Sequence, residues 1–266
     1  RNVNALTTLD LTFNECAFIQ NYSPTNGGAL NFGANPYMAN FNYHLQNCKF
    51  DDNNANDKGN ALFINTYQTI DCYGCNFTNN KSNQGQQIIY IETYFKCTGV
   101  EIPDRNPNII ISKCTFDDAT KSFMNEIQIE NSLDTSVLIS ECIFTDCITT
   151  GFSISVNYVV KDVKIKNCSF IYNNDDQLSS TIYSKTDNIA LIGNLFSKCF
   201  QNTIQILNQN NNNKVELIEN TFIDCFKGEI SELTFTEQPV IEGNVFKNVK
   251  LDCSIFQFKL QSINTI

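Results

Sequence analysis

The chain has 266 residues, of which 42% are hydrophobic and 17% charged, so it contains enough apolar material for a packed core and is neither disordered nor collagen-like. Its formal net charge of -10 repels phosphate backbones and anionic lipid surfaces. No apolar run reaches the roughly 18 to 20 residues that a membrane-spanning helix requires. We therefore expect a folded protein with no nucleic-acid partner and no membrane span in this segment.

Residue usage favours β-structure. The chain has 39 Asn, 30 Ile and 21 Phe, against 11 Gly, 5 Pro and no Trp. Ile and Phe favour pleated, half-buried strands, whereas Asn favours turns because its side chain bonds the local backbone and tolerates positive φ. No apolar stripe with a 3.6-residue period is sustained. We predict an all-β protein of short strands joined by Asn-rich turns.

A short pattern recurs nine times along the chain: Cys or Asn, any residue, then Phe. The Cys or Asn of each repeat, here called the anchor, is Cys16, Cys48, Cys75, Cys114, Cys142, Cys168, Asn194, Asn220 or Asn244. The corresponding Phe residues are Phe18, Phe50, Phe77, Phe116, Phe144, Phe170, Phe196, Phe222 and Phe246. From Phe116 onward, successive repeats are 28, 26, 26, 26 and 24 residues apart.

Each repeat predicts three strands. Apolar residues stand five and three positions before the anchor, as Leu11 and Phe13 do before Cys16, and a two-residue step marks one face of a strand. The three-residue step to the anchor breaks this alternation, so we predict a bend there, followed by a second strand that carries the Phe. A second Asn or Cys follows three residues later, then a polar turn and a third strand. Third strands are predicted near residues 61–64, 127–129, 152–156, 204–206 and 256–258.

Three strands in about 26 residues cannot bury their own inner face, but stacking each coil on the next buries a continuous apolar column. The sequence therefore predicts a right-handed parallel β-helix of about nine three-stranded coils, the hand following from the usual rule for parallel crossovers. We assign residues 1–266 to a single β-helix domain with insertions at 33–40 and 92–108. Because neither end carries a capping segment, we expect a piece of a longer chain.

The first two coils carry a recognisable motif pair. Phe18 and Asn21 are followed by Gly-Gly-Ala-Leu at residues 27–30, and Phe50 and Asn53 by Gly-Asn-Ala-Leu at residues 59–62. These motifs resemble the repeats of polymorphic outer-membrane adhesins, and the whole chain is similar to right-handed β-helix proteins of the pectin-lyase-like superfamily. The resemblance implies a non-enzymatic β-helix, extracellular or at the cell surface, used for attachment or assembly. It supplies no catalytic residue.

Six of the twelve Cys occupy the anchor position. Equivalent Cβ atoms of stacked coils lie about 4.8 Å apart, beyond the roughly 3.5 to 4.5 Å of a relaxed disulfide, so we predict a ladder of buried thiols. The alternative disulfides are Cys97 with Cys72 or Cys75, and Cys199 with Cys225. Where the anchor changes to Asn, stacked amides are expected to hydrogen-bond along the column.

Residues for metal binding or catalysis are few. The single Cys-x-x-Cys pair, at 72 and 75, falls on repeat positions and His44 is the sole imidazole, so we predict no metal and no cofactor, with weak Ca²⁺ binding by carboxylates left open. The acidic pairs at 51–52, 117–118 and 175–176 are the candidates for a glycosidase pair, but they read as repeat or turn positions. We predict no catalytic residue. The alternative is a polysaccharide-processing enzyme or a carbohydrate-binding module of the pectin-lyase-like type, with Tyr73 stacking on sugars.

The expected partners are proteins or further copies, bound through the rod ends, the rim loops or a lateral face. Apolar residues recur at outward positions and form either a contiguous lateral stripe or a surface covered by another segment. They are Ile110, Leu138, Ile143, Ile192, Leu195, Ile218 and Val245. N-glycosylation sequons begin at Asn21, Asn76, Asn80 and Asn167, of which Asn80 is expected to be the more accessible.

Overall fold

The computed structural model describes residues 8–33, 40–65, 69–80, 87–92, 108–117, 127–130, 135–145, 152–157, 160–171, 180–186, 188–199, 203–207, 214–226, 231–235, 238–250 and 255–260. Among these residues there are 29 strands and no helix. The strands form three parallel nine-stranded sheets and one two-stranded sheet, β3 (Tyr22–Ser23) with β7 (Asn54–Ala55). The predicted all-β parallel β-helix is confirmed.

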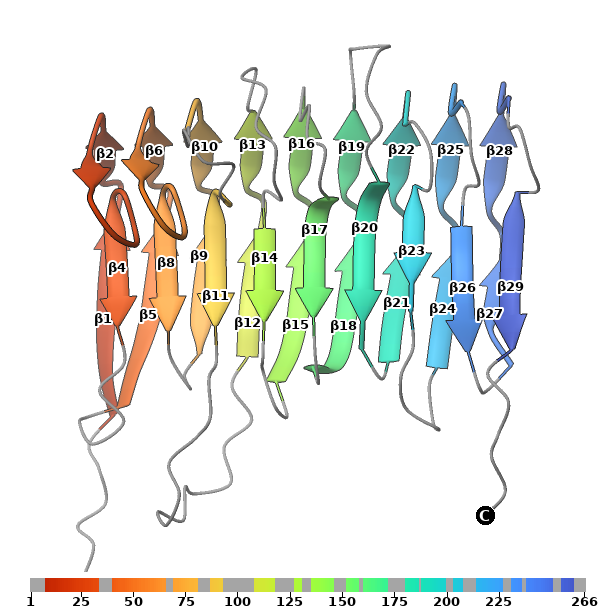
Figure 1. Cartoon of the computed structure of the whole chain (residues 1–266), viewed down its shortest axis with the longest axis horizontal. Coiled ribbons are helices and arrows are strands. Elements are labelled where there is room, and N and C mark those ends of the chain that lie inside the picture. The colour runs from red at the N-terminus through yellow and green to blue at the C-terminus, as the bar shows by residue number, and fades with distance from the viewer. Residues whose placement is uncertain are drawn as a thin grey trace, which may run out of the picture.

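Each large sheet collects one strand from every coil (Figure 1). Sheet 1 contains β1 (Thr8–Asn14), β5 (Asn40–Gln46), β9 (Ile70–Tyr73), β12 (Asn108–Ser112), β15 (Thr135–Ser140), β18 (Val160–Lys166), β21 (Asn188–Ile192), β24 (Lys214–Ile218) and β27 (Val240–Glu242). Sheet 2 contains β2 (Ala17–Ile19), β6 (Lys49–Asp51), β10 (Asn76–Thr78), β13 (Thr115–Asp117), β16 (Ile143–Thr145), β19 (Ser169–Ile171), β22 (Leu195–Ser197), β25 (Thr221–Ile223) and β28 (Val245–Lys247). Sheet 3 contains β4 (Leu30–Gly33), β8 (Leu62–Asn65), β11 (Ile89–Glu92), β14 (Ile127–Glu130), β17 (Phe152–Asn157), β20 (Ser180–Lys185), β23 (Ile204–Ile206), β26 (Ser231–Phe235) and β29 (Phe256–Leu260).

The path of one coil runs from sheet 1 through sheet 2 to sheet 3, and the next coil begins again in sheet 1. In Figure 1 the chain ascends along sheet 1 at the rear, crosses to the front at the top and descends along sheet 3 while it advances from left to right. This path is right-handed, as the crossover rule predicts. The described residues form one continuous stack; residues 34–39 and 93–107 of the two predicted insertions lie outside them.

The first bend of every coil has a common backbone geometry. The residue immediately before each anchor has φ between +53° and +65°, the left-handed region. Gly occupies this position in three coils, and Asn, Glu or Lys in the other six: Glu15, Asn47, Gly74, Lys113, Glu141, Asn167, Gly193, Glu219 and Gly243. One left-handed residue between two short strands turns the chain sharply, and this turn directs the anchor side chain inward.

The core is a single apolar column running through the stack. Alternate residues of sheets 1 and 3 point into it, as Ile109 and Ile111 do from β12 and Ile127 and Ile129 from β14, and these four side chains are at most 1% exposed. Strand register aligns each inward residue with its equivalent in the next coil, for example Ile89 with Ile127. The predicted third strands are present as β8, β14, β17, β23 and β29.

Candidate functional site

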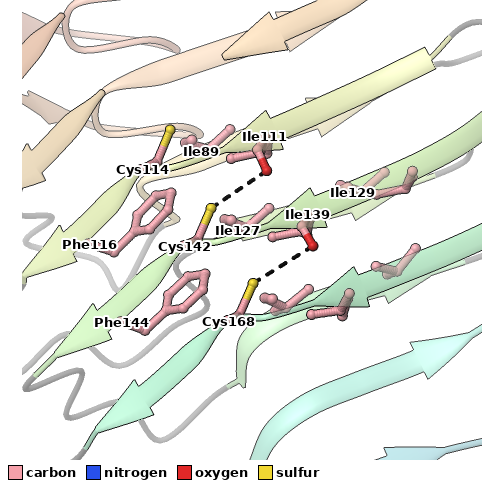
Figure 2. Packing of buried hydrophobic residues seen from close by; sticks show 14 of the residues in the cluster. Ile89, Ile111, Cys114, Phe116, Ile127, Ile129, Ile139, Cys142, Phe144 and Cys168 are labelled. Atoms are coloured by element: carbon pink, nitrogen blue, oxygen red, sulfur yellow. Dashed lines mark hydrogen bonds between the residues drawn. The ribbon is translucent and has the colours of Figure 1, made fainter. Parts of the chain in front are cut away.

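Nine Phe rings form one file inside the column. From Phe18 to Phe246, successive ring centroids are 4.8 to 5.0 Å apart and the planes are within 3° to 9° of parallel. Phe116 and Phe144 of two neighbouring coils show this stacking in Figure 2. The seven internal rings are at most 1% exposed, so the file is a continuous and fully buried part of the core.

Asn anchors connect consecutive coils with an identical set of hydrogen bonds. The Nδ2 of Asn220 donates to the Leu191 carbonyl at 2.8 Å and its Oδ1 accepts from the backbone N–H of Asn194 at 3.0 Å. Both Leu191 and Asn194 belong to the preceding coil. Asn194 and Asn244 repeat this pattern, with Nδ2 to carbonyl distances of 2.9 and 2.7 Å. The anchor amide therefore supplies a donor and an acceptor to buried backbone groups that the bend leaves outside the strand ladder.

Cys anchors occupy the same positions as the Asn anchors, but the thiol is a weaker hydrogen-bonding group than the amide. The Cys142 thiol contacts the Ile111 carbonyl at 3.5 Å, and the Cys168 thiol contacts the Ile139 carbonyl at 3.7 Å (Figure 2). In each case the carbonyl belongs to the residue three positions before the previous anchor, as with Asn. The Sγ of Cys75 also accepts the backbone N–H of Cys48, at 3.4 Å. Cys and Asn are interchangeable here because both offer a donor and an acceptor in a small side chain.

The second bend carries a second ladder, again behind a left-handed residue. Asn53 donates through Nδ2 to the Phe18 carbonyl at 2.9 Å and accepts the Asn21 backbone N–H at 3.1 Å, while Asn80 donates to the Phe50 carbonyl at 3.0 Å. Asn80 is wholly buried by this role, so the expectation that it is the more accessible sequon is wrong. Asn21, Asn76 and Asn167 are exposed.

Farther along, the second ladder changes from Asn to Cys. Cys199 and Cys225 are free thiols, which contradicts the alternative disulfide between them. They occupy equivalent positions in consecutive coils, where the strand spacing separates the Cβ atoms too widely for a relaxed bond. Cys72 and Cys75 are also free, and Cys97 lies outside the described residues. Burial raises the pKa of the Cys48 and Cys199 thiols, which keeps them protonated and able to donate.

The outward apolar residues do not form one contiguous stripe. On sheet 2, Ile143 is flanked by Thr115 and Ser169, and Thr221 separates Leu195 from Val245. On sheet 1, the neighbours Ile110 and Leu138 are followed by Lys164 in the same row. Ile192 and Ile218 form a second pair between Lys166 and Glu242. The predicted stripe is interrupted because hydroxyl and charged residues alternate with the apolar ones along the rod.

The outer face of sheet 3 holds a polar cluster that the repeat pattern did not predict. Tyr90 points outward from β11 yet is 2% exposed. Its hydroxyl donates to Glu130 Oε2 at 2.6 Å and accepts from Lys58 Nζ at 2.8 Å, and the ammonium lies 4.3 Å from its ring centroid. Burial raises the pKa of Tyr90, and Glu130 and Glu92 raise it further, so the phenol stays protonated.

Two carboxylates meet in this outer cluster. Glu92 and Glu130 are register partners on β11 and β14, and Glu92 lies 3.4 Å from Lys58. Gln128 donates to Glu130 and accepts a hydrogen bond from Gln87 at 2.5 Å. The cluster joins three consecutive coils through charge-assisted hydrogen bonds. The sequence signal that would have located it is the repetition of Glu at the last position of two aligned third strands.

The described residues of the sequence-predicted acidic pairs, Asp51, Asp52 and Asp117, lie on or just after strands of sheet 2 and are separate from this cluster. Asp51 bonds Lys49 at 2.8 Å and Thr78 at 3.0 Å, and the hydrogen bond from Lys49, followed by that from Asn79, lowers its pKa. Asp118 and the pair at 175–176 lie outside the described residues.

Tyr73, the candidate for sugar stacking, and His44, the sole imidazole, also have charged neighbours. The Tyr73 side chain, 40% exposed, has the Lys113 ammonium 3.1 Å from its hydroxyl and 5.2 Å from its ring centroid, so a cation already lies near the ring face. His44 lies 3.9 Å from Asp10 and 3.6 Å from Asp71. Within the described ranges, no group of three or more His, Cys, Asp or Glu side chains is arranged to hold a metal ion.

Comparison with known proteins gave no match to this chain among protein-family models, curated proteins or solved structures. The likeness to adhesin repeats and pectin-lyase-like proteins therefore rests on the residues quoted for it. In the part of the chain that the structure describes, no helix is both long and apolar enough to cross a membrane.

Proposed function

We propose that this protein is a non-enzymatic structural or adhesive rod, extracellular or at the cell surface, that forms part of a larger assembly. The proposal rests on where the repeated residues lie in each coil. The anchors, the Phe file and the second-bend ladder all point inward and serve the stack. The repeated positions are thus the inward ones that hold neighbouring coils together. A stack of coils joined in this way forms an extended, rigid body.

Surface chemistry supports an extracellular setting. Asn76 and Asn167 stand at exposed sequons, and neither amide belongs to the inner ladders. A glycan attached at either position projects from the wall and leaves the core undisturbed. The net charge of -10 also keeps an elongated protein soluble and disfavours its association with acidic polymers.

Secretion through a glycosylating pathway tests this proposal. We expect N-glycans at Asn76 and Asn167 and an unmodified Asn80, measured by peptide mass spectrometry before and after enzymatic deglycosylation. The purified rod is expected to leave pectin-like and chitin-like polysaccharides intact while it binds fixed cell surfaces or a glycan array. Hydrolysis or elimination of those polysaccharides by the pure protein would refute the non-enzymatic assignment.

A second candidate is a polysaccharide-processing enzyme, favoured by the outer cluster of sheet 3. Register pairing places Glu92 and Glu130 side by side on neighbouring strands, and a retaining glycosidase likewise holds two carboxyl groups close together. One carboxyl group would then act as the acid and the other as the nucleophile, with Lys58 as the neighbouring cation. Against this, Glu130 already accepts from Tyr90 and Gln128.

One pair of variants decides between the two candidates. Glu130→Gln removes a carboxylate from the cluster, and Glu141→Gln removes an exposed carboxylate at a first bend. If the chain is an enzyme, polysaccharide cleavage falls by orders of magnitude in the first variant and is unchanged in the second. The structural proposal predicts no cleavage by the parent or by either variant.

A further inference from the structure

Coil 3, formed by β9, β10 and β11, carries a thiol where the other coils carry a larger apolar side chain. The residue three positions before each anchor lies in the apolar column or packs against it. In chain order these residues are Phe13, Leu45, Cys72, Ile111, Ile139, Ile165, Leu191, Leu217 and Ile241. Cys72 is 1% exposed, at an inward position of β9. It therefore adds a second thiol to the core of a coil that already has the anchor Cys75.

The anchor ladder brings this additional thiol against the next anchor, Cys114. A Cys anchor contacts the carbonyl of the residue three positions before the previous anchor, and Cys114 follows the rule with its Sγ 3.5 Å from the Cys72 carbonyl. Because the residue at that place is a cysteine, the Cys114 Sγ also lies 3.7 Å from the Cys72 Sγ. Both side chains are 1% exposed. Two sulfur atoms from consecutive coils thus lie in contact inside the column.

This pair differs from two thiols at equivalent positions of consecutive coils, whose Cβ atoms the strand spacing holds too far apart for a relaxed disulfide. Cys72 and Cys114 stand on opposite sides of the first bend, so the strand spacing does not set the distance between them. The sulfur atoms must approach by about 1.7 Å to reach the length of a disulfide bond, a movement of the size that side-chain rotation provides. Cys75, the other thiol of coil 3, is directed to the coil before it, with its Sγ 3.5 Å from the Leu45 carbonyl.

The pair also bridges the longer of the two insertions. Cys72 and Cys114 are 42 residues apart in sequence, and the insertion at 92–108 lies between them. Each coil of a stacked repeat contacts only its neighbours, so coils 3 and 4 must find one another across this added length of chain. A covalent link between the two coils closes that loop in the unfolded chain. The loss of unfolded-state entropy grows with loop length, so a link at this place stabilises the stack more than one within a single coil.

We infer that Cys72 and Cys114 are a disulfide site that locks coil 3 to coil 4 when the chain folds in an oxidising compartment. The inference rests on the proposed extracellular function, which supplies that compartment. The oxidant is a small-molecule or protein disulfide. The thiolate of one cysteine attacks it and releases one thiol, and the thiolate of the other cysteine then displaces the second. In total the two cysteines lose two protons and two electrons, and the disulfide of the oxidant is reduced to two thiols.

The test refolds the 266-residue chain either in a buffer of oxidised and reduced glutathione or in an excess of a thiol reductant. Cys114→Asn removes one sulfur of the pair and keeps a donor and an acceptor at the anchor, because Asn is the anchor of three other coils. Cys168→Asn makes the same exchange in coil 6, away from the pair. Tandem mass spectrometry of the unreduced digest identifies the joined sulfur atoms and distinguishes Cys72 from Cys75. Circular dichroism measures the midpoint of thermal unfolding.

We expect the oxidised parent to contain the Cys72–Cys114 bond and to unfold about 10 °C above the reduced parent. Cys168→Asn is expected to keep this difference and Cys114→Asn to lose it. If Cys114→Asn does not fold, Cys72→Val takes its place, because an apolar residue is usual at that position.

Three results would overturn the inference: Cys72 and Cys114 remain reduced in the glutathione buffer, either one is joined to a different cysteine, or the difference in unfolding temperature persists without the pair. Secreted protein that carries glycans and keeps both thiols free would refute the disulfide site alone. Polysaccharide cleavage by the disulfide-linked protein would instead refute only the proposed function.

Discussion

Replacing Asn220 tests whether the ladder amides stabilise the stack. Its side chain donates to the Leu191 carbonyl and to Asn244, and accepts from the backbone and the side chain of Asn194, all within 2.8 to 3.0 Å. Asn220→Ala leaves the Leu191 carbonyl and the Asn194 N–H buried without these partners. At about 1 to 3 kcal/mol for each buried backbone group, the expected loss of unfolding free energy is about 4 kcal/mol.

Asn220→Cys provides the matched comparison. Six other coils use Cys at this position, and the Cys168 thiol reaches the equivalent carbonyl, that of Ile139, at 3.7 Å. A thiol restores a weaker donor and acceptor, so we expect a loss of about 1 to 2 kcal/mol. Asn76→Ala, at an exposed position on the wall, is expected to change stability by less than about 0.5 kcal/mol.

Urea denaturation followed by circular dichroism measures all three variants, with the slope of the transition checked for constancy. From most to least destabilised, the expected order is Asn220→Ala, then Asn220→Cys, then Asn76→Ala. Equal losses for Asn220→Ala and Asn220→Cys, within about 0.5 kcal/mol, would show that a thiol recovers none of the amide's contribution and would refute the shared donor and acceptor role of Cys and Asn at this bend.

Three further changes follow from the same structure. Phe144→Ala opens a cavity between two rings and is expected to lower the free energy of unfolding by about 3 to 5 kcal/mol, whereas Ile143→Ala beside it lowers it by less than about 0.5 kcal/mol. Chemical denaturation of both variants measures the two losses. Equal losses would contradict a file of inward-pointing rings. Gly74→Ala adds a Cβ to a residue with φ +64° and places it 2.5 Å from Asn47 Oδ1. Thermal melting is therefore expected to show a destabilisation of about 1 to 2 kcal/mol. An unchanged melting curve would refute backbone strain at this position. Because the pKa of Asp51 is lowered in the folded state, its carboxylate contributes stability above about pH 4, the ordinary range of the group, and this contribution is lost as pH falls through the folded pKa. Asp51→Asn is therefore expected to be less stable than the parent at neutral pH and equally stable in acid, as measured by urea denaturation across pH. A difference in unfolding free energy that does not change with pH would exclude this origin.

The sequence predicted the inner architecture well because its signals are periodic. Phe recurs at a nearly constant interval, and an anchor two residues before each Phe marks the same bend, so the stacked file from Phe18 to Phe246 follows directly. The left-handed residue before each anchor was not predicted. Glu141 and Lys113 have no intrinsic preference for positive φ, and it is the closed coil that requires the conformation there.

The predictions failed where the surroundings of a side chain are set by residues of neighbouring coils. Asn80 was expected to be the more accessible sequon, yet it belongs to the second ladder and is buried between Asn53 and the Phe50 carbonyl. The cluster around Tyr90 was missed for the same reason, since Lys58 and Glu130 come from the coils before and after it. Residue spacing within one repeat does not report which outward side chains from different coils meet.

Distances between spin labels on the outer wall test the stacking most directly. Ala17, Ile143 and Val245 lie in one row of sheet 2, with Ile143 four coils from each of the others. Double electron–electron resonance on paired nitroxides, with excess unlabelled chain added, is predicted to give about 19 Å for each four-coil pair and about 38 Å for Ala17 with Val245. A longest distance that is not about the sum of the other two would contradict a straight stack of nine coils.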